Sequence, residues 1–480
     1  MRKLEAALPV ATGAVAYIAA DNLGSLSFLV FVCLVPLLLS LKYEDGRGAW
    51  KRGYLFGFVF GLGELFWLGQ ITEKWVHSWG LGMVPWLVAT VLMALYFGLF
   101  AILAQRAIIA GRGWAVPIIW SGMEVFRSYI PVLAFPWALL SEPLWRSPWL
   151  IQTAHVGTIY LVSAWVAAIN WLVARTIEDR KNWKPLAVVA AGGCAISLAL
   201  YAINPPTRPL RVAIGQTGVD MAFNDRETAQ ALTDRAVASI VGYARRSRAG
   251  LLVLPEDSTQ ELVEGGPVQG FRLDSKIPTV VGAQRGTGPF YQSAVGYDGK
   301  WQSTDKTRLV IFGEFVPGRD VLPFLKVFNL PSGDLSAGTN GVRAIRFHSL
   351  TVGPIVCFEE LFPDITYKQS MNGSNLLAVL SIDDWFVGTS APQQLMCSSV
   401  WRAIETGLPL VRATPLGDSL AVDLHGRFIR SLPQGNYDPE TVTVPIPQAP
   451  FAPFWLPVYP VLALLASVVL PFLKPKDARR

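Results

Sequence analysis

Residues 351–360 read TVGPIVCFEE, an apolar run that reaches Cys357 and leads into Glu359 and Glu360. A short apolar run bounded by turn and helix signals predicts a buried strand. A cysteine at the point where a strand gives way to a helix is a candidate nucleophile if a neighbouring group takes its proton, because the thiolate attacks and the thiol does not. The alternative is a small buried side chain that only packs.

Two earlier stretches favour the nucleophile. Residues 251–257 (LLVLPED) predict a buried strand that ends in Glu256, and residues 305–317 (DKTRLVIFGEFVP) place Lys306 and Glu314 around an apolar run. Taken alone, each is more simply a solvated loop acid or a surface lysine. Together they give the order Glu, Lys, Cys at intervals of about 50 residues, which leaves room for the strands and helices of a layered α/β domain.

Acyl transfer by a cysteine needs a base, a positive group for the tetrahedral oxyanion, and exclusion of water. Glu256 fits the base, and Lys306 fits the oxyanion partner that also lowers the pKa of the thiol. Glu314 is predicted to hold Lys306 charged and aligned. A backbone N–H near Phe358 is expected to complete the oxyanion site, and Glu359 lies within reach of the nucleophile or favours a helix N-terminus, as Glu360 would.

These stretches resemble the three signatures of the nitrilase superfamily, in LPE at 254–256, in Lys306 with FGEFVP at 312–317, and in VCFE at 356–359. The form with FGEFVP, in a chain that also has many long apolar segments, is similar to the apolipoprotein N-acyltransferase family. Three signatures in this order form a specific pattern, whereas any one of them alone would be weak.

The resemblance implies an αββα sandwich domain joined to a helical bundle of about eight transmembrane spans, with Glu256, Lys306 and Cys357 as the catalytic triad. It implies substrate contacts from Tyr291, Gln292, Trp385 and Phe386. The implied reaction moves a fatty acyl chain from a phospholipid, through a thioester on the cysteine, to the α-amino group of the S-diacylglyceryl cysteine of an apolipoprotein.

The chain departs from the family at four places around the expected pocket. Ile382, Gln292 and Pro415 stand where the family commonly has asparagine, and Leu395 stands where it has histidine. These changes leave two alternatives open, a membrane-tethered amidase that uses water as acceptor, and a divergent paralogue that binds lipids or lipoproteins without turnover. No metal cluster, nucleotide loop or disulfide framework is evident, so we expect no cofactor, and we expect a monomer.

Composition places the chain in a membrane. Apolar residues make up 52% of it and charged residues 16%, well below the quarter expected of a soluble protein. The formal charge of +6 lies in short Lys and Arg clusters between apolar runs, which suits membrane topology better than nucleic-acid binding.

The sequence predicts seven spans in residues 1–205 and an eighth in 450–480. They run at about 8–20, 23–41, 54–71, 81–104, 114–130, 150–174, 186–203 and 454–473. Basic residues gather in the alternate connections 42–52, 106–112 and 175–184 and in the tail after 473. The positive-inside rule therefore predicts cytoplasmic termini and an extracytoplasmic domain at 206–449. The family resemblance implies that the membrane is the inner membrane of a bacterial cell.

That domain begins after a proline-rich linker at 204–209. Strands are predicted at 211–215, 251–254, 279–283, 293–297, 344–347, 352–356, 376–380 and 410–413, and helices at 226–248, after 359 and near 392. Apolar segments near Phe315, Phe324, Phe328 and Leu330 are candidates to enter the membrane surface.

One predicted span contains charges. Glu124 and Arg127 lie three residues apart on one helix, shortly before the FPW at 135–137, and the family has a similar pattern. Charged residues inside a span are costly and usually functional. The prediction is nevertheless a structural ion pair that locks the bundle.

Overall fold

The computed structural model describes residues 2–20, 26–220, 224–263, 266–267, 273–274, 276–286, 288–319, 334–435, 437–450 and 453–473. The chain divides into two compact units, one made of Met1–Ile203 with Trp455–Arg480 and the other of Asn204–Phe454. The first unit is helical and the second is α/β.

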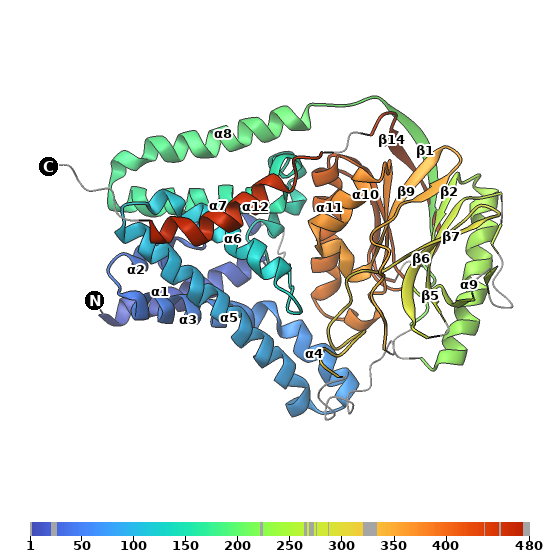
Figure 1. Ribbon diagram of the computed structural model, residues 1–480, viewed down its shortest axis with the longest axis horizontal. Coiled ribbons are helices and arrows are strands. Elements are labelled where there is room, and N and C mark those ends of the chain that lie inside the picture. Colours follow the sequence, from blue (N-terminus) through green and yellow to red (C-terminus); the bar gives the residue numbers. More distant parts are fainter. Residues whose placement is uncertain are drawn as a thin grey trace. The chain divides into compact units, whose positions relative to one another are not determined.

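The helical unit brings its N-terminal helices together with the C-terminal helix (Figure 1). Its α-helices are α1 (Arg2–Ala20), α2 (Val35–Leu41), α3 (Gly46–Glu64), α4 (Phe66–Val76), α5 (Trp79–Ile109), α6 (Val116–Tyr129), α7 (Ala154–Glu178), α8 (Trp183–Tyr201) and α12 (Val458–Val469). Short 3-10 helices lie at η1 (Ser27–Phe31), η2 (Gly113–Ala115), η3 (Glu142–Arg146), η4 (Pro148–Leu150), η5 (Arg180–Asn182) and η9 (Leu470–Phe472).

Within the described residues, three helices are long and apolar enough to cross a membrane, namely α5, α7 and the helix at Arg180–Tyr201. Helices α3 and α4 make a fourth if their 51° bend is counted within one span. The other apolar helices are shorter. Two predicted spans are therefore not the single helices that we expected, because 54–71 bends at Leu65 and 23–41 breaks between η1 and α2.

Asn170 of α7 explains how the second break is tolerated. Its Oδ1 accepts from Leu34 N at 2.8 Å, and its Nδ2 donates to Val30 O at 2.8 Å. These are backbone groups on either side of the break, and Asn170 is fully buried. An interrupted helix survives in an apolar setting when a neighbouring helix satisfies the freed backbone groups.

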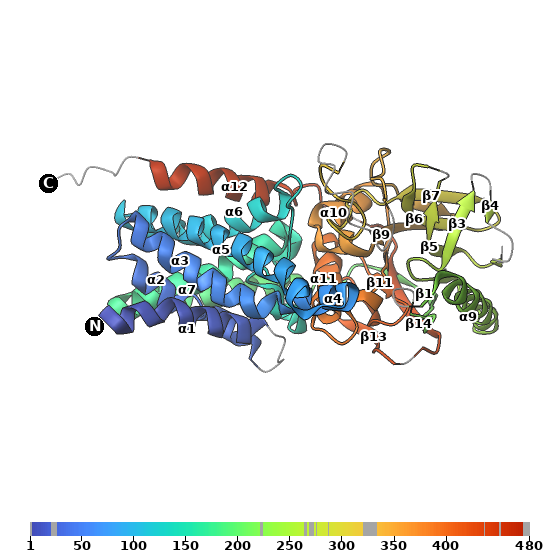
Figure 2. The same ribbon diagram turned by 90° about the horizontal axis from the view of Figure 1, so that it is seen from below.

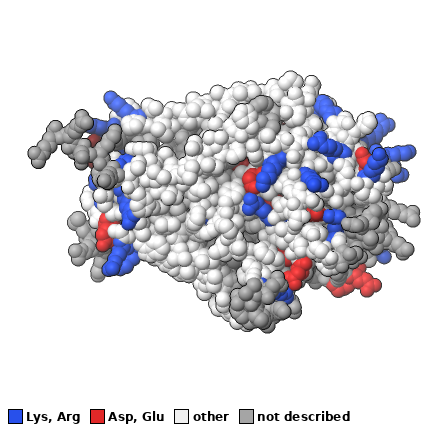
Figure 3. Space-filling view, in the orientation of Figure 1, with Lys and Arg blue, Asp and Glu red and all other residues white. Residues whose placement is uncertain are grey.

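Three contacts gather the basic connections at one end of the helical unit. Lys42 pairs with Glu178 at 3.1 Å, Gln105 Nε2 donates to Glu44 O at 2.7 Å, and Arg112 Nε donates to Leu470 O at 3.2 Å. Lys and Arg cluster at this end in the space-filling view, and the face of the helices seen there is almost free of charged residues (Figure 3). The unit thus has the charge distribution of a membrane bundle with one basic end.

The α/β unit is a sandwich of two sheets. One has eight strands in the order β14-β1-β2-β5-β3-β4, with β6 on β5 and β7 on β6, and the other has six in the order β13-β12-β11-β10-β9-β8. The strands of the first are β1 (Thr207–Ile214), β2 (Leu251–Val253), β3 (Thr259–Val263), β4 (Gly266–Pro267), β5 (Thr279–Arg285), β6 (Tyr291–Tyr297), β7 (Trp301–Asp305) and β14 (Glu440–Pro447). Those of the second are β8 (Ile345–Phe347), β9 (Leu350–Val356), β10 (Leu376–Leu380), β11 (Leu410–Ala413), β12 (Ser419–Val422) and β13 (Phe428–Leu432).

Apolar residues of both sheets share one buried core, which includes Val212 and Val280 of the first sheet and Val352 and Ala378 of the second. Helix α9 (Arg226–Arg246) packs on the outer face of the eight-stranded sheet through a second core. Helices α10 (Pro363–Met371) and α11 (Ala391–Thr406) lie on the other side of the strands (Figure 2). The predicted αββα sandwich is confirmed.

The predicted strands and helices of this domain are all present, with ends shifted by a few residues. The sequence did not predict β3, β4, β7 and β12 to β14. Strand β14 pairs antiparallel with β1 from Thr207↔Pro447 to Ile214↔Glu440, so the two ends of the domain lie side by side. Pairing between segments this far apart in the chain leaves no local signal.

Candidate active site

The three sequence motifs follow strands of both sheets, because β2 and β7 belong to the eight-stranded sheet and β9 to the six-stranded sheet. Glu256 follows β2, Lys306 follows β7, and Cys357 follows β9. Gly282 of β5 lets the Glu256 loop come close, because any side chain there would collide with the Glu256 backbone. Parallel strands present their following loops at one edge of a sheet, and functional side chains collect at such edges.

A strained backbone position marks each motif. Asp257 has φ +55°, Phe312 has φ +60° and Cys357 has φ +50°. Positive φ is unfavourable for residues with a Cβ and persists only where the surrounding structure enforces it. The cysteine is therefore held in a sharp turn between strand β9 and the 3-10 helix η7 (Cys357–Leu361).

Lys306 lies between two carboxylates. Its Nζ is 2.5 Å from Glu314 Oε1 and 3.5 Å from Glu256 Oε1, and its side chain is fully buried. Among the residues that the structure describes, Oε2 of Glu256 has no hydrogen-bond partner. The Cys357 side chain interacts with Glu256. The structure thus brings together the four residues that the sequence singled out as base, oxyanion partner, its carboxylate support and nucleophile.

Burial raises the pKa of Glu256 to about 8, although Lys306 opposes this shift. Burial alone would lower the pKa of Lys306, but Glu256 and Glu314 outweigh it and hold that pKa above its ordinary value. Burial and then Glu256 raise the pKa of Cys357, against the effect of Lys306. Lys306 therefore lowers the pKa of the thiol as expected, but the desolvation cost is larger, so the net shift of that pKa is upward.

Glu359 connects the lysine motif to the cysteine motif through hydrogen bonds. Its carboxylate accepts from Val356 N at 3.2 Å and from both the backbone N–H and the hydroxyl of Thr307 at 2.7 Å. It thus ties the turn after Lys306 to the turn that carries the cysteine. Phe358 N–H lies in the first turn of η7, where N–H groups have no partner inside the helix. This placement fits the predicted oxyanion donor.

The expected substrate contacts divide into two groups. Gln292 is buried. Its side-chain amide donates to Asp257 at 2.7 Å, and its backbone carbonyl accepts from Lys306 N at 2.7 Å. Its contacts thus connect the Glu256 loop with the lysine. Trp385 and Phe386 are half-buried on η8 (Asp384–Phe386), and Trp385 packs against the core cluster that contains Cys357. Tyr291 begins β6 and its ring lies 6.0 Å from the Arg285 guanidinium.

A buried ion cluster was not predicted from sequence. Arg412 on β11 pairs with Glu360 at 3.1 Å and with Asp383 at 2.9 Å, and all three side chains are fully buried. Glu360 lies in the first turn of η7, as the sequence indicated, and its carboxylate also belongs to this ion cluster. An arginine inside the apolar run LVRA at 410–413 was the available signal, because a buried guanidinium requires carboxylate partners.

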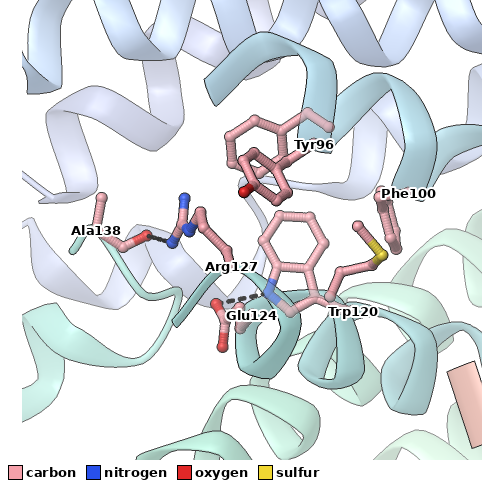
Figure 4. Close-up of a pocket in the computed structure, with 8 residues that line it drawn as sticks. Tyr96, Phe100, Trp120, Glu124, Arg127 and Ala138 are labelled. Atoms are coloured by element: carbon pink, nitrogen blue, oxygen red, sulfur yellow. Dashed lines mark hydrogen bonds between the residues drawn. The ribbon is translucent and has the colours of Figure 1, made fainter. Parts of the chain in front are cut away.

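Glu124 and Arg127 line a small hollow in the helical unit with Tyr96, Phe100 and Trp120 (Figure 4). They do not form the predicted ion pair. Glu124 accepts from Trp120 Nε1 at 2.9 Å and from Leu140 N at 2.7 Å, and Arg127 donates to Trp137 O at 2.7 Å. Each charge instead anchors the irregular segment after α6, whose backbone groups need partners in an apolar setting.

Comparison with known proteins agrees with this arrangement. Residues 12–172 match the apolipoprotein N-acyltransferase N-terminal domain, and residues 287–450 match the carbon-nitrogen hydrolase family. The chain is 28% identical to an apolipoprotein N-acyltransferase of Geobacter metallireducens, over 84% of this chain and 82% of that protein. Its identity to the apolipoprotein N-acyltransferase of Sinorhizobium fredii is 30%, over 85% and 83% of the two chains.

Among solved structures, Saccharomyces cerevisiae Nit3, a member of branch 10 of the nitrilase superfamily, matches 52% of this chain and 93% of its own, with 16% identity and a TM-score of 0.38. The similarity to the two curated relatives extends through both units and through all three motifs of the buried site. The chain therefore belongs to the apolipoprotein N-acyltransferase family, membrane-associated acyltransferases of the nitrilase superfamily that act in lipoprotein biosynthesis.

Proposed function

We propose that this enzyme carries its acyl chain on Cys357, taking it from a phospholipid and passing it to the α-amino group of the S-diacylglyceryl cysteine of an apolipoprotein. The observation that carries the proposal is a buried lysine between two carboxylates, beside a cysteine at positive φ. A site of this kind supplies a base, a fixed positive charge and a nucleophile without bulk water.

In the first half-reaction, Glu256 takes the thiol proton as Cys357 Sγ attacks the ester carbonyl of the phospholipid. The raised pKa of the thiol means that the proton leaves during attack and not before it. Lys306 Nζ and the N–H of Phe358 face the developing oxyanion. The tetrahedral intermediate collapses with loss of the lysophospholipid oxygen, which receives the proton held by Glu256.

In the second half-reaction, the α-amino group of the acceptor attacks the thioester carbonyl. Glu256 takes a proton from the attacking amine and returns it to the departing Cys357 sulfur, so the amide forms and the free thiol is restored. Glu314 keeps Lys306 charged through both steps. These steps call on no cofactor, and each chain carries the whole set of residues, so we propose that the monomer is active.

Trapping the acyl-enzyme tests this proposal against the amidase and the non-catalytic alternatives. Purified enzyme incubated with phospholipid alone is expected to carry a long acyl chain on the Cys357 peptide. Cys397 is the internal control, because it is buried in α11 and donates to Gln394 O at 2.9 Å. A diacylated peptide added afterwards should take the acyl chain from Cys357 and carry it as an amide. No adduct would support a binding protein, and release as free fatty acid with no amide would support the amidase.

The pH dependence of acylation should report Glu256. The base must be unprotonated, and its pKa of about 8 lies above neutral pH, so the single-turnover rate should rise with pH through a midpoint near 8. Below that midpoint Glu256 holds a proton and cannot accept one from the thiol. Because Lys306 and Cys357 interact with Glu256, the midpoint is a property of the interacting group and not of Glu256 alone. A flat profile from about pH 6.5 to 8.5 would contradict the assignment of the base.

We also propose that residues 204–454 form an extracytoplasmic domain and that both termini are cytoplasmic. The gathering of the basic connections and the end of α12 at one end of the helical unit supports an even number of crossings, eight in all. Several of these are short, since α6 with 14 residues rises only ~21 Å. The catalytic domain would then lie on the outer side of the membrane, the side of the leaflet that holds both lipid substrates.

Labelling with a membrane-impermeant maleimide tests this topology. We expect it to modify Lys300→Cys, an exposed residue after β6, in spheroplasts with intact membranes, and to modify Lys181→Cys, an exposed residue of η5, only after the membrane is opened. The unmodified chain with its four native cysteines gives the background. The reverse pattern would mean that the orientation is inverted.

A further inference from the structure

We propose that the hydroxyl of Ser381 is a further functional group of this site, which binds the sulfur of Cys357 and stabilises it as the thiol proton departs. Asp383 and Arg412 are positioning residues that act through Ser381. This inference rests on the proposed role of Cys357 as nucleophile.

The sheet places the serine beside the cysteine. Strands β9 and β10 are parallel, and their last register pair is Val356 with Leu380. The next residues along the two strands are Cys357 and Ser381, so they stand side by side at the ends of adjacent strands, and their side chains interact. Ser381 N donates to Ala413 O of β11 at 3.1 Å, so the serine is also anchored to the strand on its other side.

The hydroxyl has a second partner. Ser381 Oγ donates to Asp383 Oδ1 at 2.8 Å. A hydroxyl has one proton, so while Asp383 holds it the Oγ lone pairs remain for the neutral thiol. When the sulfur becomes negative, the same proton can turn to it. The carboxylate tolerates that loss because Arg412 donates to both of its oxygens, Nη1 to Oδ2 at 2.9 Å and Nη2 to Oδ1 at 3.0 Å.

Arg412 also fixes the distance between Ser381 and Cys357, across which the hydroxyl proton turns from Asp383 to the sulfur. Its Nε and Nη2 donate to the two oxygens of Glu360 at 3.2 and 3.1 Å. Glu360 lies in the same short helix as Cys357, and Asp383 lies in the turn that begins at Ser381. One planar guanidinium therefore connects the turn of the nucleophile to the turn of the serine, a bidentate geometry that lysine cannot reproduce.

The simpler explanation is that the cluster only stabilises the sheet. Ser399 separates the two explanations, because it is fully buried and its hydroxyl donates to Glu360 Oε2 at 3.0 Å. Ser381→Ala and Ser399→Ala each remove one hydroxyl from the same ion cluster, but only Ser381 faces the sulfur. The other charged groups around the thiol are Glu256, Lys306 and Glu314, and neither substitution alters them.

The experiment measures alkylation of Cys357 by iodoacetamide in the full-length enzyme in detergent, by peptide mass spectrometry across pH, together with thermal unfolding. We expect Ser381→Ala to slow alkylation about tenfold at a given pH and to move its midpoint to higher pH, since the thiolate loses a donor. Ser399→Ala should stay within about twofold of wild type at a similar unfolding temperature.

Arg412→Lys is a second variant, which keeps the positive charge and loses the planar guanidinium. It should change alkylation in the same direction as Ser381→Ala. If Ser381→Ala and Ser399→Ala alkylate alike, the inference is wrong and the cluster is structural. The readout does not need acyl transfer, so an enzyme that never forms an acyl adduct would refute the proposed function while the alkylation series still decides the role of Ser381.

Discussion

Cys357→Ala and Cys357→Ser are expected to abolish acyl transfer, with a loss of about 10⁴-fold or more, while the protein stays folded and membrane-inserted. Alanine offers no nucleophile. Serine offers a hydroxyl that is much less acidic than a thiol, and Glu256, whose own pKa is about 8, is too weak a base to activate it. Turnover with phospholipid donor and diacylated peptide acceptor is the measurement.

Folding should survive these two substitutions for a structural reason. Cys357 has φ +50°, and cysteine, alanine and serine all carry one Cβ, so the strain of this turn is the same in each. The side chain is small, and the variants leave Lys306 paired with its carboxylates. Retained transfer by Cys357→Ala, in protein with an unchanged unfolding temperature, would rule out the covalent mechanism.

Lys306→Met should reduce turnover by about 10²- to 10³-fold, the effect of losing roughly 3 to 4 kcal/mol of oxyanion stabilisation. The lysine is fully buried and 2.5 Å from Glu314, so its charge is fixed before the reaction begins. Lys306→Arg should not rescue activity, because a wide planar guanidinium replaces a compact ammonium between Glu256 and Glu314.

Lys368 provides the matched control. It lies on α10, half-exposed, and pairs with Asp364 at 2.9 Å. An exposed pair of this kind contributes little, so Lys368→Met should leave turnover within a small factor. Lys306→Met leaves two buried carboxylates without a partner, so its unfolding temperature must be measured beside its rate. If it retains more than about a tenth of wild-type turnover, Lys306 is not the oxyanion partner.

The sequence by itself determined the class of fold, the candidate catalytic residues and the basic connections of the helical unit. Glu256 and Cys357 could be singled out because each follows an apolar run that must become a buried strand, and strand ends place such residues at a surface edge. Lys306 could be singled out through its motif with Glu314, because strand β7 before it was not predicted. Eight strands of the α/β domain were predictable from the sequence, since periodicity and turn residues are local properties of the chain.

Only the tertiary structure decided which charges pair. Glu360 and Arg412 lie 52 residues apart and join through their buried side chains, whereas Glu124 and Arg127 lie on one helix and bond to separate backbone groups. The same holds for the pairing of β14 with β1 and for the breaks near Leu34 and Leu65. Burial made the pKa of the Cys357 thiol rise where its lysine neighbour alone would have lowered it. These outcomes depend on desolvation and on contacts between distant segments, and those exist only once the chain has packed.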